Sequence, residues 1–176
     1  MSGDQDHSSI SADAQDFVDM NIFEQILELD DEGSDREFSK ELVFGFFEQA
    51  ENTFDEIGHS LEERNLEKLL ALGHFLKGSA AALGIYKVRD ACEKIQHLAA
   101  GRDESGFEHI EREESLAKIR DILPTLKIDY KAAKDWLTTF FRPGEYVVTG
   151  TVQDGKSNYL EGAMLVGLYM FVALTF

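Results

Sequence analysis

The chain has 176 residues, 43% of them hydrophobic and 29% charged, which suits a single soluble globular domain. Its formal net charge of −17 at pH 7 argues against a nucleic-acid ligand, because proteins that bind a duplex cluster Lys and Arg against the phosphates. Cys92 is the only cysteine, which excludes an internal disulfide and indicates a reducing compartment, and we expect its thiol to be a buried packing group.

The N-terminal part of the chain is acidic and polar. Its first 35 residues hold eleven Asp or Glu and neither Lys nor Arg. Residues 1–15 are rich in Ser and Asp, so we expect a disordered tail. A secretory signal peptide would instead begin with a basic region followed by an apolar one. We therefore predict that the folded domain begins near residue 16.

Apolar residues recur at helical spacing along most of the chain after that tail. The segment 17–29 predicts a first helix, with an apolar stripe wider than one helix contact needs. Four further amphipathic patterns predict helices over 38–61, 64–83, 87–100 and 111–141, with a polar loop over 101–108. Such patterns favour an antiparallel four-helix bundle, to which the first helix is an addition. We therefore predict an all-α domain over residues 16–142.

Capping and helix-breaking residues refine these boundaries. Ser34 and Asp35 are candidate N-caps for the second helix. Gly84 fits a left-handed end of the third helix. Pro124 lies inside the last pattern, where the missing N–H donor is expected to kink or split the helix.

Residues 143–176 differ in composition from the rest of the chain. A Pro-Gly pair ends the last helical pattern, and the segment 146–152 has strand propensity. The final fourteen residues, 163–176, are uncharged and mostly apolar, whereas a membrane-spanning helix needs about twenty; an interfacial or tail anchor stays open. We expect an atypical extension of uncertain structure, explained by intron read-through in the gene prediction, so that a chain ending near residue 141 would already be complete.

The third predicted helix has two distinct faces. Its apolar face is a leucine stripe formed by Leu69, Leu72, Leu76, Ala80 and Leu83. The opposite face carries His74, Lys77, Gly78 and Ala81. Gly78 and Ala81 have almost no side chain, so another macromolecule can approach the imidazole closely. The pattern predicts a histidine that is offered to a partner surface.

The motif His74-x-x-Lys77-Gly78, the small-residue run after it and the segment 92–96 together resemble the histidine phosphotransfer (HPt) proteins of fungal multistep phosphorelays. The resemblance runs from about residue 17 to residue 141. It implies a carrier that accepts a phosphoryl group on His74 from a receiver aspartate of a hybrid sensor kinase and passes it to response-regulator receivers. It also implies a monomeric protein of the cytoplasm and nucleus in osmotic or oxidative stress signalling.

The residue types in this motif suit phosphoryl transfer, which needs a placed nucleophile and charge stabilisation. An imidazole in water is mostly neutral at pH 7, so one ring nitrogen has a free lone pair that can attack an acyl phosphate. Lys77 can neutralise the phosphoryl oxygens, and Gly78 leaves room for the donor. Gln96 can donate a hydrogen bond to those oxygens or hold the ring, because an antiparallel fourth helix brings it level with His74.

Nucleotide and metal ligands have no signal in this sequence. It contains no glycine-rich nucleotide loop, so the phosphoryl group has to come from a phosphorylated protein rather than from ATP. We expect no cofactor and no metal ligand from this chain. By the resemblance, Mg²⁺ is held in the acidic pocket of the partner receiver domain.

A docking patch for receivers is also predicted. Its residues are Ile22, Ile26, Leu29, Phe38, Leu42 and Ala81. The first three lie on the outer part of the first helix, where the resemblance places receiver contacts. The next two lie beside the buried stripe of the second helix, and exposed apolar patches often mark partner contacts. Ordinary core and edge packing is the alternative for these apolar residues.

Two other functions are compatible with a helical bundle. A di-iron carboxylate site needs two Glu-x-x-His motifs, and the sequence has one, from Glu56 to His59. A non-catalytic bundle that binds receivers without carrying phosphate has the same fold. Such a protein has no need of both His74 and Lys77, which favours the carrier.

Overall fold

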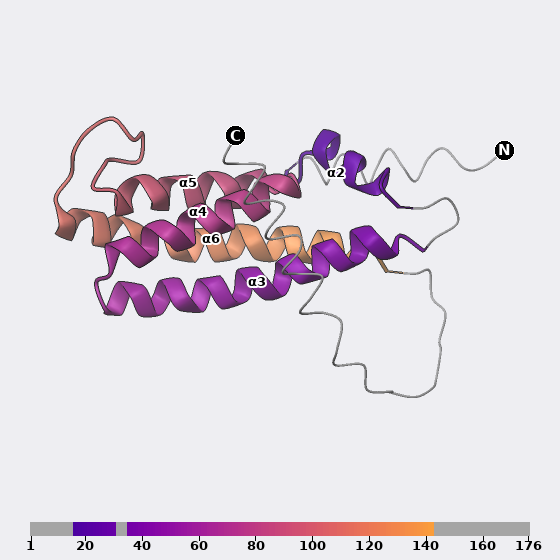
Figure 1. Ribbon diagram of the computed structural model, residues 1–176, viewed down its shortest axis with the longest axis horizontal. Coiled ribbons are helices and arrows are strands. Elements are labelled where there is room, and N and C mark those ends of the chain that lie inside the picture. The colour runs from indigo at the N-terminus through magenta and orange to yellow at the C-terminus, as the bar shows by residue number, and fades with distance from the viewer. Residues whose placement is uncertain (1–15, 31–34, 143–176) are drawn as a thin grey trace.

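Five helices form an all-α bundle in the computed structural model, which describes residues 16–30 and 35–142 (Figure 1). They are α2 (Met20–Leu27), α3 (Glu37–Glu62), α4 (Leu66–Ala82), α5 (Tyr86–Ala99) and α6 (Arg112–Phe140). The predicted fold class is confirmed. The predicted N-terminal tail, the Ser34 cap and the C-terminal extension lie outside the described residues.

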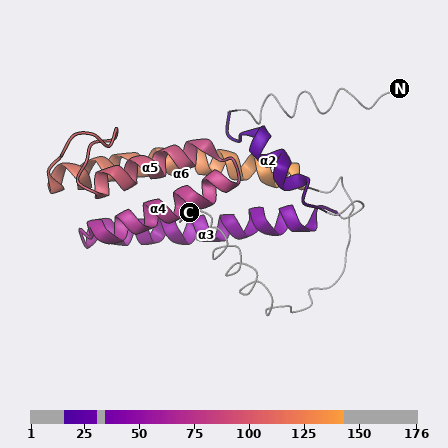
Figure 2. The ribbon, with the colours of Figure 1, turned by 45° about the horizontal axis from the view of Figure 1, so that its top comes forward.

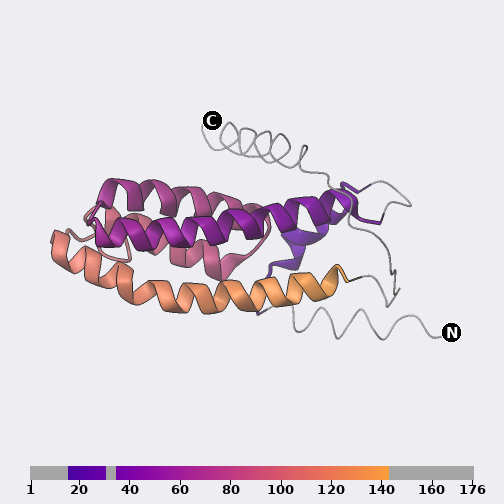
Figure 3. The ribbon, with the colours of Figure 1, turned by 90° about the horizontal axis from the view of Figure 1, so that it is seen from below.

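The four longer helices lie side by side, and α2 covers the end of the bundle where α3 begins and α6 ends (Figures 2 and 3). Phe23 of α2 is fully buried at this end. Its ring packs edge-on against three aromatic rings from the end of α6, with centroid distances of 6.0 Å to Trp136, 5.3 Å to Phe140 and 6.0 Å to Phe141. This aromatic cluster fixes the short helix α2 on the bundle.

The turn between α4 and α5 depends on Gly84. Its φ of +73° is left-handed, and a Cβ at this position would lie 2.8 Å from the carbonyl oxygen of Asp19. The carbonyl of Gly84 accepts a hydrogen bond from the N–H of Asp19 at 2.8 Å. Asp19 is the N-cap of α2. The predicted end of the histidine helix is confirmed, and the same glycine also holds the start of α2.

The first turn of α3 is capped by a residue from the preceding segment. The N-cap position is Arg36, with a left-handed φ of 52° and no side-chain cap. Asp35 instead pairs with Lys40, with 2.7 Å between Oδ2 and Nζ. The carboxylate of Asp30 accepts hydrogen bonds from the backbone N–H of Ser39, at 3.1 Å, and from its hydroxyl. The prediction of Asp35 as the cap is wrong, because Asp30 instead accepts the hydrogen bonds of Ser39 in the first turn.

Helix α6 continues through Pro124 without a break. The proline removes the donor that would bond to the carbonyl of Arg120, and both residues are exposed, so water can satisfy that carbonyl. Ile119 before the proline and Leu126 after it are both fully buried. The predicted split does not occur, because both halves of the helix pack on the same core.

Cys92 lies on the buried face of α5. Burial raises the pKa of its thiol to about 12, so the thiol is protonated at neutral pH. The thiolate is the reactive form of cysteine, so this residue is inert and packs as a small apolar group. The expectation of a buried thiol is confirmed.

Candidate functional site

His74 lies on the face of α4 that points away from the core. The residues of the predicted stripe that are buried, at most 2% exposed, are Leu69, Leu76, Ala80 and Leu83. Leu72 is half-buried, and His74 is exposed. The N-cap of the helix is Asn65, whose side chain accepts a hydrogen bond from the N–H of Lys68 at 3.0 Å. The amphipathic pattern therefore turns the imidazole to solvent, as predicted.

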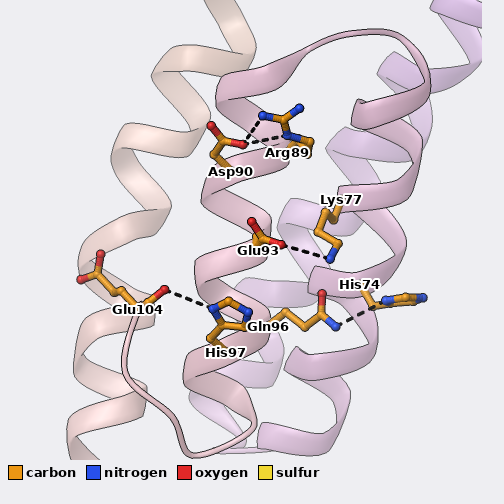
Figure 4. Close-up of polar contacts among 8 residues, drawn as sticks. All are labelled: His74, Lys77, Arg89, Asp90, Glu93, Gln96, His97 and Glu104. Atoms are coloured by element: carbon orange, nitrogen blue, oxygen red, sulfur yellow. Dashed lines mark hydrogen bonds and ion pairs between the residues drawn. The ribbon is translucent and has the colours of Figure 1, made fainter. Parts of the chain in front are cut away.

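Helix α5 brings Gln96 beside that imidazole. Among the helices of the described chain, α4 packs most extensively against α5. The side-chain nitrogen of Gln96 lies 3.5 Å from Nδ1 of His74, and Figure 4 shows the ring extending beyond the amide, away from α5. The sequence predicts that the two residues lie level on antiparallel helices, and this placement is confirmed. Nδ1 thus faces the protein, and Nε2 is on the side open to a partner.

The amide of Gln96 can control which ring nitrogen carries the proton. A neutral imidazole has one N–H and one lone pair, so Nε2 has a free lone pair only when Nδ1 carries the hydrogen. Gln96 presents its Nε2 to the ring, while its Oε1 is buried without a hydrogen-bond partner among the described residues. Rotation of the amide by half a turn brings Oε1 to Nδ1. In that arrangement Nδ1–H donates to Gln96, and Nε2 of His74 is left unprotonated.

Lys77, one turn after His74, is held in an ion pair. Its Nζ lies 3.5 Å from Oε1 of Glu93, with side-chain exposures of 29% and 47% (Figure 4). Glu93 was not among the predicted site residues. It precedes Gln96 by three positions on α5 and so lies on the same helix face, which is the signal that could have identified it. The ammonium is partly sheltered beside the imidazole, where it can meet an incoming anion.

The other residues around His74 have different exposures. Gly78 and Ala81 are half-buried small residues on α4, consistent with room for a partner. Phe75, next to His74, is 45% exposed. Sequence reasoning missed this residue, although its position off the centre of the leucine stripe is typical of a partly exposed side chain. An exposed phenyl ring beside the imidazole gives the site an apolar margin.

The predicted docking residues are exposed to different degrees. Leu29 is 66% exposed and Phe38 is 45% exposed, so both are accessible to a partner. Ile22 and Leu42 are half-buried. Ile26 is 7% exposed and packs in the core cluster, so it offers little surface to a partner, which corrects the expectation for that residue. The wide stripe of α2 thus contributes to both the core and the surface.

The site needed for a di-iron protein is not formed by the residues that suggested it. His59 is well exposed on α3, and Glu56 pairs with Lys68 at 3.2 Å instead of converging with other carboxylates. Over residues 16–30 and 35–142, no group of three or more His, Cys, Asp or Glu is arranged to hold a metal ion.

Comparison with known families gives the class of this bundle. The Hpt domain model matches residues 41–136, more than half of the chain. The chain belongs to the Hpt family. This match includes the segment of α4 and α5 that carries His74, Lys77 and Gln96.

Relatives of this Hpt protein occur in fungi. It is 42% identical over 125 residues to multistep phosphorelay regulator 1 of Schizosaccharomyces pombe. The aligned region covers 70% of this chain and 42% of that protein. It is 51% identical over 80 residues to the phosphorelay intermediate protein YPD1 of Candida albicans, covering 46% of this chain and 42% of that protein. The chain thus spans less than half of the length of these curated relatives.

A solved structure has the same fold as this Hpt protein. It is the co-crystal structure of the Saccharomyces cerevisiae histidine phosphotransfer signaling protein Ypd1 and the receiver domain of its downstream response regulator Ssk1. The TM-score is 0.62 at 32% sequence identity, over 71% of this chain and 94% of that chain. The all-α bundle of this chain is therefore similar in fold to that histidine phosphotransfer protein.

Proposed function

We propose that this Hpt protein is a phosphoryl carrier between receiver domains. It accepts a phosphoryl group on His74 from a receiver aspartate of a hybrid sensor histidine kinase and passes it to receiver aspartates of response regulators. The observation that carries the proposal is the exposed imidazole of His74 with Gln96 at Nδ1, one helical turn from the partly sheltered ammonium of Lys77. The receiver bound to Ypd1 in the related structure supports the partner class.

The reaction is a reversible exchange of a P–O bond for an N–P bond. The lone pair of Nε2 of His74 attacks the phosphorus of an aspartyl phosphate, and the carboxylate leaves with the electrons of the broken P–O bond. Nδ1 of His74 keeps its proton. After the amide rotation, this N–H donates a hydrogen bond to Oε1 of Gln96. Transfer to the next receiver reverses these steps with a new carboxylate. Mg²⁺ belongs to the acidic pocket of the receiver in this proposal, and this chain supplies none of its ligands.

During the transfer, Lys77 has to leave the carboxylate of Glu93 and pair with the phosphoryl oxygens. In the resting protein it pairs with Glu93 across 3.5 Å. A phosphoryl group on Nε2 would bring three oxygens near the ammonium, and a charge-assisted hydrogen bond to them is shorter and stronger than this ion pair. Lys77 therefore neutralises the charge that arrives with the phosphoryl group, while the half-buried Gly78 leaves space for the donor.

A transfer assay separates the carrier from the non-catalytic docking bundle. The full chain is mixed with a receiver domain carrying ³²P on its aspartate, with Mg²⁺ present. A carrier takes up label as an acid-labile, alkali-stable N–P bond and releases it to a second, unlabelled receiver. A docking bundle binds the receiver in a pull-down but remains unlabelled. Binding without label would reject the proposal.

Replacement of Lys77 by alanine is expected to slow transfer about ten- to a hundredfold, which corresponds to the loss of one hydrogen bond to a charged group. Stability is expected to change little, since partly exposed ion pairs contribute about 0–1 kcal/mol. Rapid-quench transfer kinetics and thermal unfolding measure the two effects. Lys68→Ala is the matched control, because Lys68 lies on the same helix in an ion pair with Glu56. Equal rates for the two variants would remove Lys77 from the site.

Receiver docking is expected to depend on Leu29 and Phe38, the two predicted docking residues that are exposed. Alanine at either position should weaken receiver binding about five- to thirtyfold, as is typical of an apolar contact residue in an interface. Isothermal titration calorimetry with a receiver domain measures this. Ile128 is 67% exposed on α6 and is the matched control, so Ile128→Ala should bind normally. Unchanged affinity for both patch variants would place the interface elsewhere.

The proposal also covers where the carrier acts. A relay between a sensor kinase and the response regulators of stress pathways requires the carrier in both the cytoplasm and the nucleus. In this proposal the carrier is a monomer that binds one receiver at a time. In the part of the chain that the structure describes, no helix combines the length and apolarity needed to cross a membrane. Fluorescent tagging and fractionation of cells test the location.

A further inference from the structure

Gly73, the residue before His74, lies on α4 where that helix packs closely against the backbone of α5. It is buried. A Cβ at this position would lie 3.2 Å from the carbonyl oxygen of Cys92, 3.3 Å from the backbone nitrogen of Gln96 and 3.3 Å from Cγ2 of Ile95. Two of these three atoms belong to the backbone of α5. A methyl group could therefore be accommodated only if α5 moved away by a few tenths of an ångström.

That displacement would act on the contact between Gln96 and His74. The distance between Gln96 Nε2 and His74 Nδ1 is 3.5 Å, which is already at the outer limit of a hydrogen bond. The atoms that a Cβ would meet on α5 include the backbone nitrogen of Gln96 itself. An outward shift of α5 at this point carries the amide away from the imidazole and leaves no hydrogen bond.

We propose that Gly73 is a positioning residue for phosphoryl transfer: by having no side chain, it lets α5 approach closely enough for Gln96 to hold Nδ1 of His74. The proposal rests on the proposed function for its effect on rate. Its geometric part stands independently, because it concerns the contact between two side chains in the free protein. Gly73 acts through Gln96 and does not touch the phosphoryl group.

A double-mutant cycle with Gly73→Ala and Gln96→Ala tests this mechanism. Gly73→Ala is expected to slow phosphoryl uptake from a labelled receiver about three- to tenfold. Misplacing a catalytic group by about 1 Å can lower the rate about a hundredfold, and the displacement expected here is smaller. In the Gln96→Ala background the same change should alter the rate less than twofold, because the contact that it disturbs is already absent. An equal loss in both backgrounds would overturn the proposal.

Nitrogen-15 NMR of the His74 ring supplies a readout that does not depend on transfer. In the wild-type chain the two ring nitrogens should differ from those of a free imidazole because Gln96 favours one tautomer. Gly73→Ala and Gln96→Ala should each shift these signals toward the free values, and by similar amounts. Unchanged ring signals in Gly73→Ala would overturn the proposal. Failure of the wild-type protein to accept phosphate would reject the proposed function but leave this measurement valid.

Two glycines of α3 provide matched controls. A Cβ at Gly45 or Gly58 would meet no atom within 4 Å. Alanine at either position should therefore leave the transfer rate and the His74 signals unchanged and raise the melting temperature, because alanine favours helix more than glycine does. If Gly73→Ala is unfolded under the assay conditions, the cycle is run in the stabilised Gly45→Ala, Gly58→Ala background. A loss of rate in the control variants would show that the effect is not specific to Gly73.

Discussion

Replacement of His74 by glutamine is expected to abolish phosphoryl uptake while the fold stays intact. The lone pair of an amide nitrogen is delocalised into its carbonyl, so glutamine offers no nucleophile for the acyl phosphate. His74 is exposed and takes no part in the core, and substitutions at such surface positions usually change stability by at most about 0.5 kcal/mol. Label incorporation from a phosphorylated receiver and thermal unfolding are the two measurements.

His59→Gln is the control for this prediction. His59 is also exposed on a helix, with a side-chain exposure of 75%, and its Nδ1 lies 4.0 Å from Oε2 of Glu62. This variant should take up label at the wild-type rate. Receiver binding by His74→Gln should also persist, because the docking residues are untouched. Label on His74→Gln would show that another residue is the acceptor.

Replacement of Phe23 by alanine is expected to be strongly destabilising, by up to about 3–5 kcal/mol. The ring is fully buried and is the contact through which α2 meets Trp136, Phe140 and Phe141. Its loss leaves a cavity that the other rings fill only partly. Because α2 is short, the first result should be release of this helix from the bundle.

Urea denaturation and hydrogen exchange of the α2 amides measure the two parts of this effect. Leu29→Ala is the control for stability, since Leu29 is 66% exposed and its change should cost less than about 0.5 kcal/mol. Phe23→Ala should also weaken receiver binding, because Leu29 lies two residues after the end of α2. Normal protection of the α2 amides in Phe23→Ala would show that the aromatic cluster does not hold the helix.

Several parts of the fold were predictable because their causes are local in the sequence. Amphipathic spacing identified the helices, and four of the five residues in the leucine stripe of α4 are buried as expected. The left-handed end of α4 at Gly84 was predictable because glycine adopts a positive φ without steric cost. The outward position of His74 is a consequence of the same periodicity, whereas its proposed role as the nucleophile rests on the motif with Lys77 and Gly78 around it.

Other features depend on contacts between residues that are distant along the chain. The cap of α3 comes from Asp30, nine residues before the Ser39 N–H that it accepts. Helix α6 stays continuous at Pro124 because both of its halves pack on one core. Ile26 and Leu29 share one amphipathic segment, yet the first is buried and the second exposed. Helical periodicity cannot distinguish them, because the boundary of the buried area is set by the neighbouring helices.

The sequence by itself determined an all-α bundle and the outward histidine, because helix formation and the division into apolar and polar faces arise within a few turns of one chain segment. The sequence also predicted Gln96 level with that histidine, whereas only the tertiary structure identified Glu93 as the partner of Lys77 beside it. Gln96 and the ion pair between Lys77 and Glu93 meet at the site because α4 and α5 pack closely. That approach is possible because Gly73 has no side chain at the point where the two backbones meet.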